Sequence, residues 1–140
     1  MSESNCIFCK IVRKEIPTEI VYEDENFLAF LDINPRSPGH TQVIPKQHYR
    51  WVWQVPNAGE YFEVVKKIAL AQQKAFGQKS VWSRITGEEI EHAHIWIFPA
   101  PSTDDKGNPS AEGLPLSENA PSLVKSDLAH NAEKIRAALS

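Results

Sequence analysis

The stretch HAHIWIFP, residues 92–99, decides the fold, because its aromatic rings alternate with small aliphatic side chains. This alternation predicts a β-strand over residues 92–98, since neighbouring side chains of a strand point to opposite faces of a sheet. The aliphatic side chains would pack into the core, and the other face would carry His92, His94, Trp96 and Phe98. Two imidazoles and an indole on one face indicate a functional site, although an isolated His-x-His also occurs on ordinary half-exposed sheets.

Four further strands and three helices are predicted around this strand. The strands are expected at residues 20–23, 27–31, 40–44 and 80–86, from their β-prone composition and the turn residues between them. Helices are expected at residues 6–14 and 58–76, where apolar residues recur at helical spacing, and at residues 128–139, after a helix cap at Ser126-Asp127. One helix is long, one is short and one closes the chain. Five short strands with one long helix predict an α+β fold with a mainly antiparallel sheet.

Size and composition predict one soluble domain, because 140 residues can bury one substantial core. We assign residues 1–100 to the main domain and 101–140 to a C-terminal extension packed on it. The Pro-, Ser- and Gly-rich part at 100–121 predicts an extended surface tail. A net charge of −3 without a basic patch disfavours nucleic acid as a partner. The lack of a membrane-spanning apolar segment or a leader predicts a cytoplasmic protein without membrane attachment.

The two cysteines, Cys6 and Cys9, form a Cys-x-x-Cys pair. Cysteines this close cannot link distant parts of a secreted domain, so the pair indicates a reducing compartment and either a metal site or redox chemistry. A thioredoxin-like redox pair normally follows a β-strand, whereas only five residues precede Cys6 in this sequence. The spacing therefore favours zinc over redox chemistry.

Four blocks of the sequence together resemble one known family. The stretch at 92–99 is similar to the motif His-φ-His-φ-His-φ-φ, in which φ is apolar, of the histidine triad (HIT) superfamily of nucleotide hydrolases and transferases. The blocks at 6–17, 21–35 and 38–48 resemble the same family in the same order. Four ordered blocks are far more specific than one short motif. The resemblance implies a HIT-like fold of the zinc-bearing bacterial type, with a variant triad.

The resemblance also implies a reaction and a nucleotide site. His94 matches the nucleophile that attacks the α-phosphorus of purine nucleoside phosphoramidates or dinucleoside polyphosphates. A nucleotidyl-histidine intermediate would form, and water would release a nucleoside monophosphate. A neutral imidazole is chemically suited to this role, because it is nucleophilic and can leave again. Asp32 is implied to bind the ribose hydroxyls of an AMP-like ligand. For the apolar positions, core packing remains an alternative. The implied nucleotide-binding positions are Ile7, Phe8, Ile11, Phe30, Asp32, Ile33, His94 and Trp96.

A metal site and a dimer are implied as well. In zinc-bearing relatives, two histidines that match His48 and His92 complete the set begun by Cys6 and Cys9. Four protein ligands leave no open position for a substrate, so this zinc would be structural. Family members often pair through the long helix and a strand, which implies a homodimer.

The sequence departs from the family pattern at two places. Trp96 stands at the third histidine position, and an indole can neither accept a hydrogen bond nor carry a proton to phosphate. The segment TGEEIE, residues 86–91, is shorter than in many hydrolases, lacks their phosphate-contacting loop and carries three glutamates. Two alternatives therefore stay open: a nucleotide-binding module with weakened catalysis, and a zinc-stabilised interaction protein.

Overall fold

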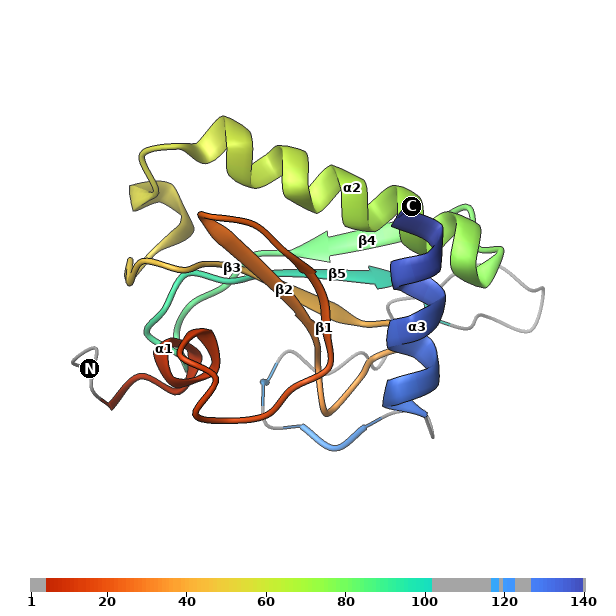
Figure 1. The fold of residues 1–140 in the computed structure, drawn as a ribbon, viewed down its shortest axis with the longest axis horizontal. Helices are drawn as coiled ribbons and strands as arrows, with labels where there is room; N and C mark the ends of the chain where they lie inside the picture. Colours follow the sequence, from red (N-terminus) through yellow and green to blue (C-terminus); the bar gives the residue numbers. More distant parts are fainter. Residues whose placement is uncertain (1–4, 102–116, 119, 123–126, 140) are drawn as a thin grey trace.

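A computed structural model describes residues 5–101, 117–118, 120–122 and 127–139, and an antiparallel sheet forms its centre (Figure 1). The strands are β1 (Ile20–Glu23), β2 (Phe27–Leu31), β3 (Thr41–Pro45), β4 (Val81–Arg84) and β5 (Ile95–Pro99). They lie in the order β1-β2-β3-β5-β4, and each neighbouring pair is antiparallel. The helices are α1 (Ile7–Val12), α2 (Ala58–Phe76) and α3 (Leu128–Leu139). The predicted α+β fold is confirmed.

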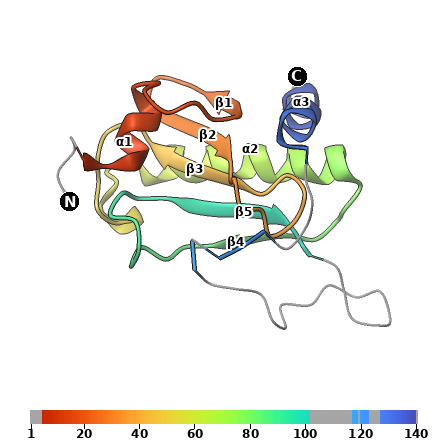
Figure 2. The same cartoon turned by 90° about the horizontal axis from the view of Figure 1, so that it is seen from below.

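Helix α2 covers one face of the sheet (Figure 2). Its buried stripe follows the helical period, so one side of the helix packs against the aliphatic side chains of β2, β3 and β5. The Tyr61 hydroxyl donates a hydrogen bond of 2.7 Å to the Val43 carbonyl of β3, and the Gln72 amide donates one of 3.0 Å to Ile97 of β5. Gly77 ends the helix at φ +63°, where a side chain would be strained.

Helix α3 lies across one end of α2 and beside β1 (Figures 1 and 2). It buries Ala132 and Ile135 in the same core as α2. The Asp127 carboxylate accepts the backbone N–H of His130 and thereby caps the helix. The predicted tail falls largely on residues outside the described ranges, as does Ser126 of the predicted cap. The division at residue 100 stays a prediction.

Several predicted boundaries differ from those observed. Strand β5 begins at Ile95, so His92 and His94 lie in the segment that leads into the strand. The reason is that the Ala93 N–H bonds to the carbonyl of Tyr49, in the loop after β3, so the ladder with β3 extends only as far as Ile95. Strands β3 and β4 and helix α1 also differ from their predicted limits, 40–44, 80–86 and 6–14.

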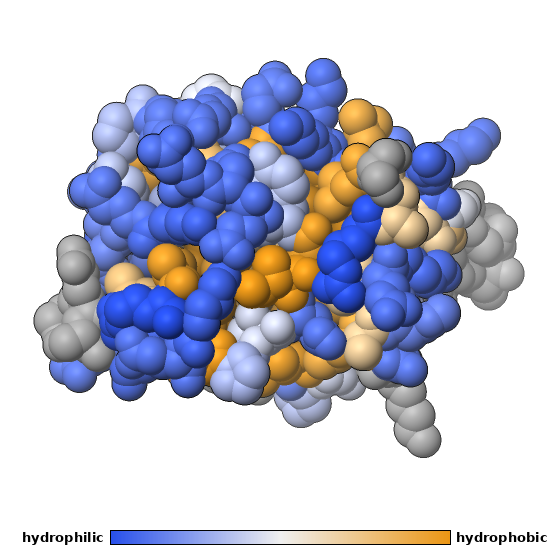
Figure 3. Space-filling view, in the orientation of Figure 1, coloured by the Kyte–Doolittle hydropathy of each residue, from blue (hydrophilic) through white to orange (hydrophobic). Residues whose placement is uncertain are grey.

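Hydrophilic residues cover most of the face seen in Figure 3, with apolar residues in separate areas between them. The outward side of α2 is polar as well, because Glu63, Lys66 and Lys67 are exposed. Within the described ranges, no helix is both long enough and apolar enough to cross a membrane.

Truncating the buried side of α2 should destabilise the protein far more than truncating its outer side. Ile68 is fully buried and Leu70 is 55% exposed on the same helix. We expect Ile68→Ala to lower the free energy of unfolding by about 2–5 kcal/mol, because it removes buried methyl groups and leaves a cavity. Leu70→Ala should change it by about 0.5 kcal/mol or less. Urea denaturation measures both, and equal losses would contradict this packing of α2.

Candidate functional site

The second face of the sheet carries a cavity of about 220 Å³ between α1 and the end of β2. Six of the predicted nucleotide-binding residues line it: Ile7, Phe8, Ile11, Phe30, Asp32 and Ile33. The Phe8, Ile11 and Phe30 side chains are also buried in a small core beneath the cavity. Ile33 is 71% exposed, so core packing does not account for it.

Asp32 lies directly after β2 and is one of the residues that line the cavity. One carboxylate oxygen accepts the Asn34 N–H at 2.7 Å, and the other accepts the Gln42 side-chain N–H at 3.0 Å. Burial raises the pKa of the Asp32 carboxyl, and the nearby charge of Glu118 adds to the increase. The carboxylate still has lone pairs available, because each oxygen can accept more than one hydrogen bond.

His40 lies beside Asp32 but does not form an ion pair with it. Burial, with smaller contributions from the charges of Arg36 and Arg84, lowers the pKa of His40 to about 3. The ring is therefore neutral at pH 7, and its Nδ1 accepts the Arg36 backbone N–H at 3.1 Å. His40 Nε2 stays 3.8 Å from the Asp32 carboxylate, which is too long for a hydrogen bond. His40 thus holds the loop between β2 and β3.

His94 is buried behind Phe8, a residue of the cavity lining, and its orientation is defined on both sides of the ring. Nδ1 lies 2.6 Å from the carbonyl oxygen of His92. A carbonyl can only accept, so Nδ1 carries the proton and donates it. Phe8 of α1 meets the His94 ring edge-on at 5.4 Å between centroids. Nε2 therefore points away from the backbone toward the site.

A carboxylate from the C-terminal extension faces His94 Nε2. Glu118 Oε1 lies 2.7 Å from this nitrogen, and Glu118 Oε2 accepts the Trp96 indole N–H at 3.0 Å and the Gln42 amide at 3.3 Å. Glu118 is buried, so the prediction of a surface tail is wrong for this residue. Burial is possible because the Trp96 indole and the Gln42 amide donate to its carboxylate and His94 Nε2 lies within hydrogen-bond distance. His94 and Trp96 do not line the cavity themselves, but both contact Glu118, which does.

The sequence reasoning missed Gln42 and Glu118. Gln42 carries a recognisable signal, because it alternates with Ile44 on the site face of β3 and is a polar residue on an otherwise apolar strand face. Glu118 carries no such signal, since it belongs to a segment without periodicity.

The indole of Trp96 lies between charged and aromatic groups. The Arg84 guanidinium lies 3.7 Å from the centre of its ring, and the His40 ring meets it edge-on at 4.5 Å. Arg84 thus supplies positive charge near the site, where Glu89 of the segment 86–91 supplies negative charge. Lys46 does not serve this purpose, because it pairs with Glu23 at 2.7 Å.

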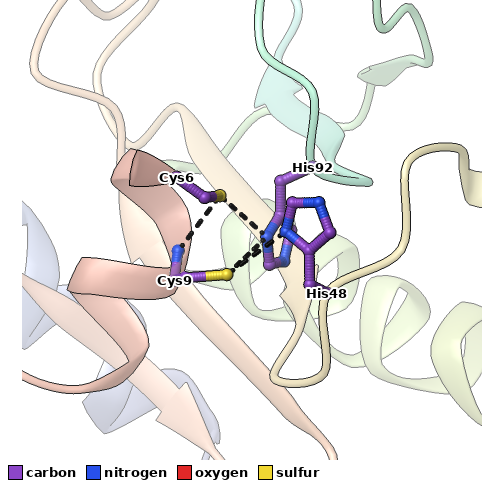
Figure 4. A group of neighbouring side chains, drawn as sticks. All are labelled: Cys6, Cys9, His48 and His92. Atoms are coloured by element: carbon purple, nitrogen blue, oxygen red, sulfur yellow. Dashed lines mark hydrogen bonds between the residues drawn. The ribbon is translucent and has the colours of Figure 1, made fainter. Parts of the chain in front are cut away.

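The four predicted metal ligands lie together (Figure 4). Cys6 caps α1 and Cys9 lies in its first turn, while His48 follows β3 and His92 precedes β5. All four ligand atoms lie within 4.8 Å of one another. Cys6 Sγ is 3.2 Å from His92 Nδ1, and Cys9 Sγ is 3.2 Å from His48 Nδ1. The structure therefore brings this predicted set together as a potential metal site.

The donor chemistry and spacing of this cluster fit zinc. Bonds of about 2.3 Å to sulfur and about 2.0 Å to nitrogen at tetrahedral angles separate the two ligand atoms by about 3.5 Å. His92 Nε2 lies 2.9 Å from the Pro45 carbonyl, so this nitrogen carries the proton and Nδ1 presents a lone pair to the sulfurs. Burial also lowers the pKa of His92 to about 4, which keeps the ring neutral at pH 7.

Comparison with known proteins gives consistent matches over most of the chain. Residues 13–103 match the HIT domain. A protein of Methanocaldococcus jannaschii described as an uncharacterized HIT-like protein is 42% identical over 103 residues, or 67% of this chain and 78% of the relative. An adenosine 5′-monophosphoramidase of Schizosaccharomyces pombe is 36% identical over 107 residues, or 71% of this chain and 77% of the relative. The crystal structure of a zinc-bound histidine triad family protein from Mycobacterium smegmatis superposes with a TM-score of 0.76 at 29% identity, covering 99% of this chain and 95% of that chain.

Proposed function

This chain belongs to the HIT family, and from that membership and the site we propose that it is a nucleotidyl hydrolase or transferase. The proposed substrates are purine nucleoside phosphoramidates or dinucleoside polyphosphates. The observation that carries the proposal is the His94 ring, whose Nδ1–H bond to the His92 carbonyl directs Nε2 at the site beside the cavity. The named activity of the fission yeast relative supports the same class of reaction.

In the proposed reaction, His94 Nε2 attacks the α-phosphorus and forms a P–N bond while the bond from phosphorus to the leaving group breaks. The leaving group takes that electron pair, and an amine leaves with a proton from solvent. Water then attacks the same phosphorus, the P–N bond to His94 breaks, and a nucleoside monophosphate is released. The carbonyl of His92 accepts the hydrogen bond from Nδ1–H throughout, so it stabilises the positive charge that develops on the ring.

The cavity would hold the nucleoside. Its apolar walls from α1 and β2 suit a purine base, because they offer flat, desolvated contact surface. Asp32 lines the cavity and has lone pairs left to accept from the two ribose hydroxyls. Base and ribose in these positions would place the phosphate toward His94.

We propose zinc as the metal of the Cys6, Cys9, His48 and His92 cluster, with a structural role. Bound zinc would cross-link the start of α1 to the loop after β3 and to the segment that leads into β5. His92 serves both sites, because its ring belongs to the cluster and its carbonyl positions His94. The cluster would therefore hold the nucleophile in place without taking part in the reaction.

A nucleotide-binding module with weakened catalysis is a second candidate, favoured by Trp96 at the third triad position. The indole N–H can donate to a phosphoryl oxygen, but it cannot deliver a proton to a leaving group. Tight binding of AMP without turnover of any phosphoramidate or dinucleoside polyphosphate would support this candidate. Pairing as a homodimer and a cytoplasmic location remain predictions from the family resemblance and from the composition.

Replacing the proposed nucleophile should abolish turnover. We expect His94→Ala to reduce kcat for an adenosine 5′-phosphoramidate by about a thousandfold or more, because no covalent intermediate can form. His130→Ala, at an exposed histidine on α3, serves as the matched control and should keep the parent rate. Release of AMP measured by chromatography reports both. A His94→Ala protein as fast as the parent would exclude His94 as the nucleophile.

Neutralising Asp32 should weaken the binding of nucleotides that carry ribose hydroxyls. We expect Asp32→Asn to reduce the binding free energy of AMP by about 1.5–3 kcal/mol, the usual contribution of hydrogen bonds to a charged acceptor. The affinity for 2′,3′-dideoxy-AMP should be unchanged by the substitution. Isothermal titration calorimetry with the two ligands tests this, and an equal loss for both would assign Asp32 another role.

Removing the metal should destabilise the protein. With free zinc at about a hundred times its Kd, binding to the native state alone adds about 2.7 kcal/mol of stability. We therefore expect a chelator to lower Tm, and His48→Ala to lower both zinc content and Tm. His130→Ala again serves as the control. Metal analysis and thermal denaturation are the measurements, and the same zinc content in parent and His48→Ala protein would rule out this ligand set.

A further inference from the structure

A short segment of the C-terminal extension lies on the face of the sheet opposite α2 (Figures 1 and 2), and its Glu118 contacts the proposed nucleophile His94. We call residues 117–118 and 120–122 the strap. Its Glu118 carboxylate is buried, accepts the indole N–H of Trp96 and the amide of Gln42, and lies 2.7 Å from His94 Nε2. An anion is thus held at the position where the proposed reaction needs a phosphoryl group.

The strap and a substrate cannot occupy this position together. Attack requires phosphorus about 3–3.5 Å from the nucleophilic atom. Glu118 Oε1 already lies 2.7 Å from His94 Nε2, on the side that faces the cavity. A carboxylate and a phosphoryl group are also chemically alike here, because both are anions whose oxygens accept hydrogen bonds from the same donors.

We propose that Glu118 is an internal substitute for the phosphoryl group of the substrate, so that the strap masks His94 until a nucleotide displaces it. In this arrangement, Trp96 and Gln42 donate to phosphoryl oxygens once the strap has left. The proposal rests on the proposed function, since it names the group of the substrate that competes with Glu118. Trp96, at the position of the third triad histidine, would thus act as a hydrogen-bond donor to the phosphoryl group.

The contacts that hold the strap are polar and therefore replaceable. The Arg36 guanidinium donates to the carbonyls of Ser117, Ala120 and Pro121 at 3.0 to 3.3 Å. Glu89 accepts the Glu118 backbone N–H at 3.0 Å. Of the strap residues, Pro121 and Ser122 are exposed and Ala120 is half-buried, so little apolar surface opposes displacement. Water can satisfy the same groups when the strap leaves.

Displacement makes the measured affinity of a nucleotide depend on how often the strap is open. If the strap is docked nine-tenths of the time, a ligand that needs the open state binds about tenfold more weakly than its intrinsic Kd. Adenosine lacks a phosphate, so it can fill the cavity while the strap stays docked. Competition should therefore affect AMP and spare adenosine.

The test compares Glu118→Ala and Glu118→Asp with the parent protein by calorimetry with AMP and with adenosine. Glu118→Asp keeps the negative charge but is shorter by one methylene, so it separates loss of the strap contact from loss of charge repulsion. We expect both variants to bind AMP about tenfold more tightly and adenosine unchanged. Glu25→Ala removes an exposed carboxylate outside the site and should leave both affinities as in the parent.

Hydrogen exchange of the parent protein gives an independent measure. Ligand binding usually slows amide exchange, but displacement predicts that AMP accelerates exchange at Glu118 and Ala120, whose N–H groups bond to Glu89 and to the Ser117 carbonyl. Adenosine should not have this effect. Slower exchange at these two amides on adding AMP would overturn the proposal.

The outcomes separate the strap from the reaction. Unchanged AMP affinity in both Glu118 variants would overturn the proposal that Glu118 competes with the phosphoryl group. The proposed function would still stand if turnover depends on His94. A lower kcat in both variants without tighter AMP binding also overturns it, because Glu118 would then assist the reaction. Tighter AMP binding in both variants supports the strap, even if no phosphoramidate is turned over and the proposed chemistry fails.

Discussion

The site depends on one hydrogen bond, from His94 Nδ1 to the carbonyl of His92 two residues earlier. It sets the direction of the ring and, in the neutral imidazole, also the tautomer, because a neutral ring whose Nδ1 donates has its lone pair on Nε2. The bond is possible because residues 92–94 leave the ladder with β3, so the His92 carbonyl is available to the ring. A segment that continued as regular strand would use that carbonyl for the sheet.

Much of the fold follows from local patterns in the sequence. The bounds of β1, β2, α2 and α3 were predicted correctly, because apolar periodicity and turn residues coincide there with the observed burial. The side-chain alternation around His94 and Trp96 was also predicted, although β5 starts later than expected. The boundary depends on a contact with Tyr49, which is 44 positions away from Ala93, and no local pattern encodes it.

The sequence predicts the part of the candidate site whose residue types and spacing are characteristic of a chemical role. It does not predict residues that reach the site only through tertiary contacts. The Cys-x-x-Cys spacing and the family resemblance gave the cluster of Cys6, Cys9, His48 and His92, and the structure brings its four ligand atoms together. Glu118 lies 24 positions beyond His94 in a segment without periodicity. Its place becomes understandable only with Arg36, a fully buried cation that donates hydrogen bonds to three strap carbonyls and to the carbonyl of Asn34. Long-range pairing of this kind leaves no trace in composition.

Helix α1 is short and contributes residues to both the metal cluster and the cavity. Six residues are too few for a helix that is stable by itself, so α1 needs its tertiary contacts to form. Its Cys9 belongs to the metal cluster, while its Ile7, Phe8 and Ile11 line the cavity. A metal ion bound at the cluster would therefore also order the α1 side chains against which a base would stack. Thermodynamic linkage makes this relation reciprocal: a nucleotide in the cavity must tighten the hold on the ion by the same factor.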